Sequence, residues 1–167
     1  LLPPERARAA QAFALYSLGI HHELADDYAA AYDAYRRAAE LDPGNERLVL
    51  RLASTLVLQR RPAEALRAVE DFLQRTPDAQ GALIWLATFY GKAGDNERVV
   101  ELFRQMTHRF PERPLGWLQL AAAQARAGDE AAGEATLQAG LAHARPPVAL
   151  RQELVRIELQ RLRLAAE

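Results

Sequence analysis

Apolar residues recur along the chain at the spacing of an amphipathic helix. Leu15, Leu18, Gly19 and His22 follow the i, i+3, i+4, i+7 pattern of one helix face, and a second stretch beginning at Ala31 repeats that pattern. Polar residues separate the two stretches. The sequence therefore predicts two short helices joined by a tight turn, which is a helical hairpin.

The hairpin pattern repeats with a period of 34 residues. Pro43, Pro77 and Pro111 lie 34 residues apart, and other positions keep the same interval. These columns are Leu18, Leu52, Leu86 and Leu120; Gly19, Ala53, Ala87 and Ala121; Ala31, Ala65, Val99 and Gly133; and Tyr35, Val69, Phe103 and Leu137. A single hairpin cannot cover its own apolar faces, whereas a stack of three or more can, so the period predicts an all-α repeat array.

The breaks between helices carry the expected signals. Asp27, Asp95 and Asp129 share one column, where a carboxylate can accept from the free N–H groups of a helix start. Arg61-Pro62 occupies that place in the second hairpin, and proline is tolerated at a first helical position. The repeated prolines are expected to end each second helix.

This pattern resembles the tetratricopeptide repeat (TPR) family over residues 12–145. The first unit carries the family signature at Leu15, Leu18, Gly19, Tyr28, Ala31, Tyr35, Ala38 and Leu41-Asp42-Pro43, and the fourth at Trp117, Leu120 and Gly128-Asp129. The sequence departs from the family pattern at five positions. It has His22 and Gln124 where an aromatic residue is usual, Phe72 and Met106 where alanine is usual, and Arg145 where proline is usual. The resemblance implies a right-handed α-solenoid with repeats at 12–45, 46–79, 80–113 and 114–147, preceded by a helical extension over 1–11.

A further helix is predicted over residues 148–167. Leu150, Leu154, Ile157 and Leu164 share one face of it. Another face carries Gln152, Glu153, Arg156, Gln160 and Arg163. We expect this helix to cap the array and to present its polar face to solvent.

Composition narrows the function classes. A net charge of -1 provides no overall attraction to nucleic acid, and the absence of cysteine excludes disulfides and thiolate chemistry. No stretch is apolar enough to span a membrane, and the start at Leu1-Leu2-Pro3 does not read as a signal peptide. The chain starts without methionine, so we expect it to be a piece of a longer or processed protein, and its localisation stays open.

The first helix of each repeat carries apolar side chains opposite its core columns, and the resemblance implies that this face lines a concave groove. This face has a surplus of positive charge, because it carries one acidic residue, Glu23, and four basic residues, Arg47, Arg51, Lys92 and Arg126. Such a groove suits a protein or peptide with apolar anchors and acidic flanks. The predicted partner-binding residues are Phe13, Tyr16, Ile20, Arg47, Leu50, Arg51, Ser54, Ile84, Trp85, Thr88, Lys92, Leu118, Gln119 and Arg126. We expect Trp85 to anchor a partner and Trp117 to be buried in the fourth hairpin.

The predicted function is therefore a protein–protein interaction scaffold. The alternatives are a homo-oligomerising array whose apolar face meets its own copy, coverage of the groove by a terminal segment of the chain, and helical-repeat RNA binding, which a mostly apolar groove disfavours. The TPR-type carboxylate clamp is disfavoured because only Arg51 could serve among its matching positions. His22 and Asp26 lie one turn apart, but packing and capping account for them better than a metal does. No catalytic motif is present, and we expect no enzyme activity, cofactor or metal.

Overall fold

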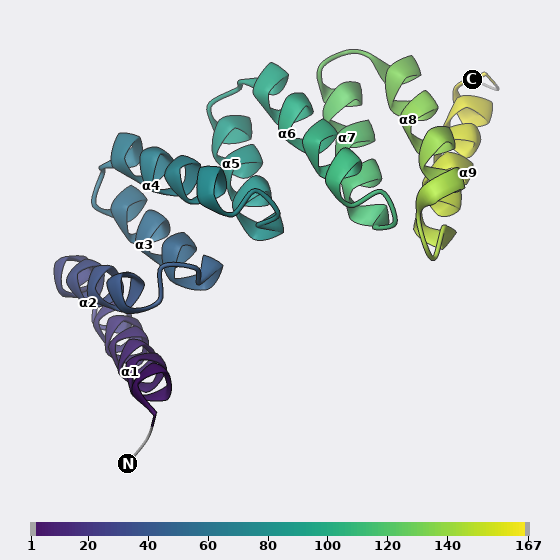
Figure 1. The fold of residues 1–167 in the computed structure, drawn as a ribbon. Helices are drawn as coiled ribbons and strands as arrows, with labels where there is room; N and C mark the ends of the chain where they lie inside the picture. The colour runs from purple at the N-terminus through teal and green to yellow at the C-terminus, as the bar shows by residue number, and fades with distance from the viewer. Residues whose placement is uncertain (1–2, 166–167) are drawn as a thin grey trace. The chain divides into compact units, whose positions relative to one another are not determined.

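A computed structural model describes residues 3–165 of the chain, and these residues form helices and turns without a β-strand. The predicted all-α fold is confirmed (Figure 1). The helices are α1 (Pro4–Leu24), α2 (Tyr28–Leu41), α3 (Glu46–Leu58), α4 (Pro62–Arg75), α5 (Gln80–Lys92), α6 (Asn96–Arg109), α7 (Pro114–Arg126), α8 (Glu130–His143) and α9 (Val148–Leu164).

The predicted helix starts and ends are confirmed. The side chains of Asp27, Asp95 and Asp129 accept hydrogen bonds from the backbone N–H groups three residues ahead, at the starts of α2, α6 and α8. Pro62 is the first residue of α4, and α2, α4 and α6 each end two residues before a repeated proline. Local capping chemistry therefore marks the starts of α2, α6 and α8, and the repeated prolines follow the ends of α2, α4 and α6.

The turns inside the hairpins repeat a backbone conformation that the sequence analysis did not identify. Asp26, Arg60, Gly94 and Gly128 all have positive φ, at 57°, 61°, 79° and 93°. They lie at the 34-residue interval of the other columns. The turn thus requires a left-handed residue at this column, which glycine adopts readily and arginine adopts at a cost.

The chain divides into two compact units, Leu1–Ala82 and Leu83–Glu167, which we call the N-terminal and the C-terminal unit. In the N-terminal unit α2 packs against both α1 and α3, and α3 packs against α4. Its core contains Tyr35, Val69 and Phe72, which are fully buried. Leu18 is an exception to its column, because it is 43% exposed whereas Leu86 and Leu120 are buried.

In the C-terminal unit α7 packs against α6, α8 and α9, and α8 packs against α9 as well (Figure 1). Leu137 of α8 and Leu150 and Leu154 of α9 form a buried cluster with Ala121 and Ala144. The expectation for α9 was partly wrong. Leu164 is 66% exposed rather than packed, and the outward side of the helix carries large apolar residues, which are described below.

Candidate partner-binding surface

A hollow of about 520 Å³ lies between α1 and the start of α3 in the N-terminal unit. The apolar side comes from α1, where the helix turns Phe13 and Tyr16 toward the hollow. The polar side comes from the loop and first turn of α3. The lining residues are Ala9, Ala12, Phe13, Tyr16, Asp42, Asn45, Glu46, Arg47 and Leu48.

A second hollow of about 380 Å³ lies along α3 and is lined by Glu46, Arg47, Leu50, Arg51 and Ser54. The two hollows share Glu46 and Arg47, so they form one surface, which we call the α1–α3 surface. The structure thus brings together six predicted binding residues: Phe13, Tyr16, Arg47, Leu50, Arg51 and Ser54.

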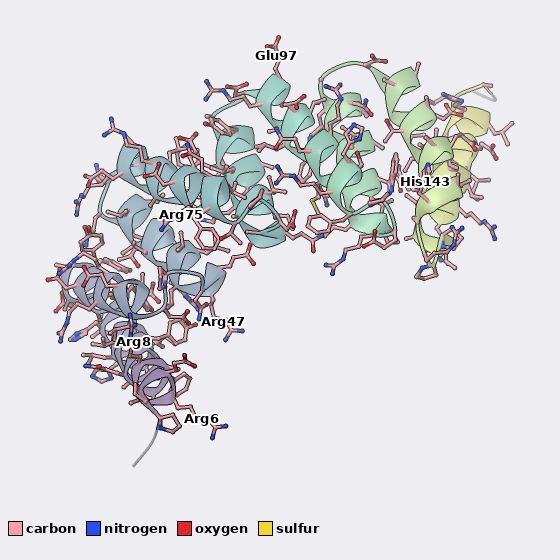
Figure 2. All side chains as sticks on the ribbon, viewed as in Figure 1. Arg6, Arg8, Arg47, Arg75, Glu97 and His143 are labelled. Carbon is pink, nitrogen blue, oxygen red and sulfur yellow. The ribbon has the colours of Figure 1, made fainter. Side chains whose placement is uncertain are left out.

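Phe13 and Arg47 are two exposed groups of the α1–α3 surface. Phe13 is 69% exposed, although it is a large aromatic residue. Arg47 is exposed and projects outward from the first turn of α3 (Figure 2). Within the described part of the chain, no acidic side chain forms an ion pair with Arg47. The surface therefore offers one apolar and one cationic contact to a partner.

Glu46 stabilises the edge of this surface. Its Oε1 accepts a hydrogen bond of 2.7 Å from the backbone N–H of Ala82, in the first turn of α5. It therefore acts as a helix cap supplied by a residue distant in sequence, since the first N–H groups of a helix lack partners inside the helix. Glu46 consequently serves the fold, and the charge of the neighbouring Arg47 is left for another ligand.

Glu23 has a role that the sequence analysis missed. Its Oε2 accepts a hydrogen bond of 2.8 Å from the hydroxyl of Tyr35 and one of 3.2 Å from Nη1 of Arg51. Its Oε1 accepts a hydrogen bond of 3.2 Å from the hydroxyl of Thr55. This network joins α1, α2 and α3. Burial, together with the hydrogen bond to Glu23, raises the pKa of Tyr35 above its ordinary value.

The Glu23 network changes the expected charge of the surface. Arg51, which was predicted to be a binding residue, already has a carboxylate partner inside the N-terminal unit. Arg47 is the cation that remains. A hint was present in the sequence: Gly19 makes room for the Tyr35 ring, and Glu23 lies one helical turn farther along α1.

The C-terminal unit has a separate hollow of about 340 Å³ between α5, α6 and α7. Four predicted binding residues line it: Thr88, Lys92, Gln119 and Arg126. Lys92 and Arg126 are exposed. Within the described residues, neither cation forms an ion pair with an acidic side chain. This hollow combines positive charge with the apolar side chains of Val99 and Phe103.

The remaining four predicted residues do not line these hollows. Ile20 and Ile84 are half-buried on α1 and α5. Trp85 is also half-buried, and its ring stacks on Phe89 with centroids 5.4 Å apart. Leu118 packs against the buried α7–α9 cluster.

The expectation that Trp117 is buried needs a correction. It is half-buried, with its indole N–H donating to the carbonyl of Pro111 at 2.8 Å. The ring stacks on His143, near the end of α8 (Figure 2), with centroids 5.8 Å apart.

The described residues contain no group of three or more metal-ligating side chains. His22 Nδ1 lies 3.9 Å from Asp27 Oδ2, and Asp27 also caps α2. No helix among the described residues has the length and apolar character needed to cross a bilayer.

The sequence model for the tetratricopeptide repeat matches residues 24–83. An uncharacterized protein of Sinorhizobium fredii, y4yS, is 36% identical over 91 residues, which is 52% of this chain and 50% of that protein. The chain therefore aligns with about half the length of this relative.

Solved structures extend the similarity to most of the chain. MamA is 14% identical with a TM-score of 0.59, and the match covers 87% of both chains. YrrB, described as a TPR protein with an unusual peptide-binding site, is 17% identical with a TM-score of 0.59 and matches 87% of this chain and 74% of its own. At these identities the likeness establishes a shared fold, that of a TPR solenoid.

Proposed function

Because this chain is a tetratricopeptide repeat protein, and such a fold implies a protein–protein interaction scaffold, we propose that its α1–α3 surface binds a peptide or helix of a partner protein. TPR proteins are in general non-catalytic scaffolds, and the proposed role requires no chemistry. The partner that fits has an apolar anchor flanked by acidic residues.

The observation that carries the proposal is the pairing of Phe13 with Arg47 around one hollow. Aromatic residues and arginine dominate the energy of protein interfaces, because they bury large areas and form directional hydrogen bonds. Phe13 is exposed in the unbound chain, so a partner that covers it gains the hydrophobic free energy that folding has left unused.

Charge supports the acidic flank. Glu46 is engaged by the α5 backbone, Glu23 by Tyr35 and Arg51, and Asp42 by the side chain of Asn45, whereas Arg47 has no acidic partner in the described residues. A carboxylate brought by the partner meets a guanidinium that can bind it through two hydrogen bonds. The hollow with Lys92 and Arg126 offers the same charge in the C-terminal unit, and we propose it as a second contact. The description of YrrB as having a peptide-binding site is in keeping with this mode of binding.

The proposal can be tested with a random peptide display library selected on the purified chain. We expect enrichment of peptides that carry an apolar residue beside aspartate or glutamate. Phe13→Ala and Arg47→Gln should each weaken a selected peptide by about tenfold, as expected for a contact worth about 1.4 kcal/mol. Both side chains are exposed, so neither change should affect unfolding.

Matched controls come from the same unit. Leu24→Ala removes an exposed apolar side chain of α1 outside both hollows, and Arg37→Gln removes an exposed cation of α2. These controls should leave peptide affinity unchanged. Peptides without acidic residues, or peptides whose affinity is insensitive to Phe13→Ala and Arg47→Gln, would show that the α1–α3 surface is not the binding site.

A further inference from the structure

Helix α9 is apolar on two opposite sides. Leu150, Leu154 and Ile157 face the cluster formed with α7 and α8. At about 100° per residue, the opposite side carries Val148, Val155, Leu159 and Leu162. These four side chains are exposed by 53%, 53%, 52% and 67%. A helix that only shields a repeat array from solvent would be polar on this side.

The exposed side chains have the spacing of a coiled-coil seam. Together with Gln152, they lie at alternating steps of four and three residues along α9, from Val148 to Leu162. This alternation keeps one narrow stripe facing a partner helix. An amphipathic helix has one such stripe and α9 has two, so the outer stripe is suited to a second helix.

Charges beside the stripe indicate which helix fits. Arg151 and Glu158 flank it on the same side, and both are exposed. In the described part of the chain neither forms an ion pair, whereas Arg156 pairs with Glu153 and Arg161 with Glu134. Three charges of α9 thus form no ion pair in the described residues: Arg151 and Glu158, which border the stripe on one side, and Arg163, which borders it on the other.

A two-fold antiparallel pair of α9 helices satisfies these charges. Arg151 of one copy then lies beside Glu158 of the other, and the symmetry forms the same pair twice. Val155 lies near the two-fold axis, and Val148 packs opposite Leu159. A parallel pair would place Glu158 opposite Arg163 of the second copy, but it would also place Arg151 opposite Arg156, which is a like-charge contact that the antiparallel pair avoids. The stripe is therefore complementary to itself in the antiparallel orientation.

We propose that the outer face of α9 is a homodimer interface that pairs two copies of this chain through an antiparallel two-helix seam. This surface lies in the C-terminal unit and shares no residue with the α1–α3 surface.

Analytical ultracentrifugation of the purified chain over a concentration series tests the proposal. The mass should rise from 18.6 kDa toward twice that value with increasing concentration. Val155→Arg places two like charges near the axis and should raise the dissociation constant by at least about tenfold. Val155 is exposed, so helical content and thermal unfolding should not change. A chain that stays monomeric throughout would overturn the proposal.

Charge exchange tests the orientation. Arg151→Glu and Glu158→Arg should each weaken the homodimer, and the double variant should restore it. A mixture of the two single variants should form heterodimers, because every flanking pair then joins opposite charges. Stronger dimerisation of Arg151→Glu alone would favour the parallel pair and refute the antiparallel one.

Phe13→Lys is the control for self-association through the other surface. It should weaken the selected peptide and leave the dimer intact, whereas Val155→Arg should do the reverse. If Phe13→Lys abolishes the dimer and Val155→Arg does not, the copies meet at the α1–α3 surface and the α9 proposal is wrong.

Discussion

Hairpins α1–α2 and α7–α8 use the same two columns with the glycine on opposite helices. The first has Gly19 on α1 and Ala31 on α2, whereas the other has Ala121 on α7 and Gly133 on α8. A Cβ at Gly19 would overlap the Tyr35 ring, and a Cβ at Gly133 would lie 2.8 Å from the carbonyl oxygen of Ala121. Glycine admits a side chain in one hairpin and a neighbouring backbone in the other.

This difference determines what else each hairpin can contain. The Tyr35 ring in the space beside Gly19 brings its hydroxyl to Glu23, which then reaches Arg51 and Thr55 of α3. Leu137 takes the place of Tyr35 in α8 and joins an apolar cluster with α9. One repeat geometry therefore supports a polar link to the next hairpin in the N-terminal unit and an apolar link to α9 in the C-terminal unit.

Of the substitutions that test this comparison, the removal of Tyr35 should lower the free energy of unfolding the most. Tyr35→Ala deletes a fully buried ring and leaves Glu23 without its donor, so the free energy of unfolding should fall by about 3–5 kcal/mol. Tyr35→Phe keeps the ring and should cost about 1–2 kcal/mol. Chemical denaturation measures both. Equal losses in the two variants would mean that the hydroxyl, rather than the ring, carries the stability.

Alanine at the two glycines should distinguish side-chain insertion from backbone approach. Gly19→Ala and Gly133→Ala should each destabilise the chain by about 1–3 kcal/mol, because the neighbouring atoms are buried and cannot move aside easily. Adding Tyr35→Leu should rescue part of the Gly19→Ala loss in a double-mutant cycle.

In the α7–α8 hairpin, shortening Leu137 should not restore the stability that Gly133→Ala removes. Gly133→Ala meets a backbone oxygen, so Leu137→Ala should add its own loss and relieve nothing. Coupling of similar size in both cycles would contradict the distinction between the two hairpins.

Neutralising Glu23 should have a smaller effect. Glu23→Gln keeps an acceptor for Tyr35 but removes the charge that faces Arg51, and we expect a loss of about 1–2 kcal/mol in a half-buried network. Glu64→Gln is the matched control, since Glu64 pairs with Arg61 at an exposed site where solvent screens the charges, and its loss should hardly change the stability. Thermal unfolding of the two variants side by side would test this, and equal shifts would argue against a structural role for the Glu23 network.

The left-handed turn column should give the smallest effect. Arg60→Gly relieves a conformation that arginine adopts at a cost, and it should stabilise the chain by about 0.5–1 kcal/mol. Gly128→Ala places a side chain in the same conformation and should destabilise by about 1 kcal/mol. If both variants shift the denaturation midpoint in the same direction, the positive φ does not control this column.

The sequence was sufficient for the features that depend on local pattern. The 34-residue columns and the caps at Asp27, Asp95 and Asp129 predict helices that the structure contains. The positive φ at Arg60 was not anticipated, although Gly94 and Gly128 in the same column were visible. Glycine at two positions of a repeat column indicates a left-handed turn, and the repeat then predicts the same backbone conformation at the other positions of that column.

Features that depend on tertiary contacts were harder to predict. Glu23 was taken for a charge of the binding face, because its distance to Tyr35 and Thr55 depends on how three helices pack. The outer stripe of α9 was overlooked, because one apolar face already accounted for the helix and the residues around Arg156 suggested a polar side. Six residues of the α1–α3 surface were among the predicted binding residues. The hydrogen bond between Glu46 and the backbone of α5 was not predicted.

Amide hydrogen exchange with and without a library-selected acidic peptide would locate the peptide on the chain. We expect slower exchange at residues 9–16 of α1 and 46–54 of α3 when the peptide binds, and loss of that protection in Phe13→Ala. Exchange in α9 should not respond. Unchanged exchange in these segments of α1 and α3, with protection elsewhere in the chain, would contradict the assignment of the α1–α3 surface as the partner-binding site.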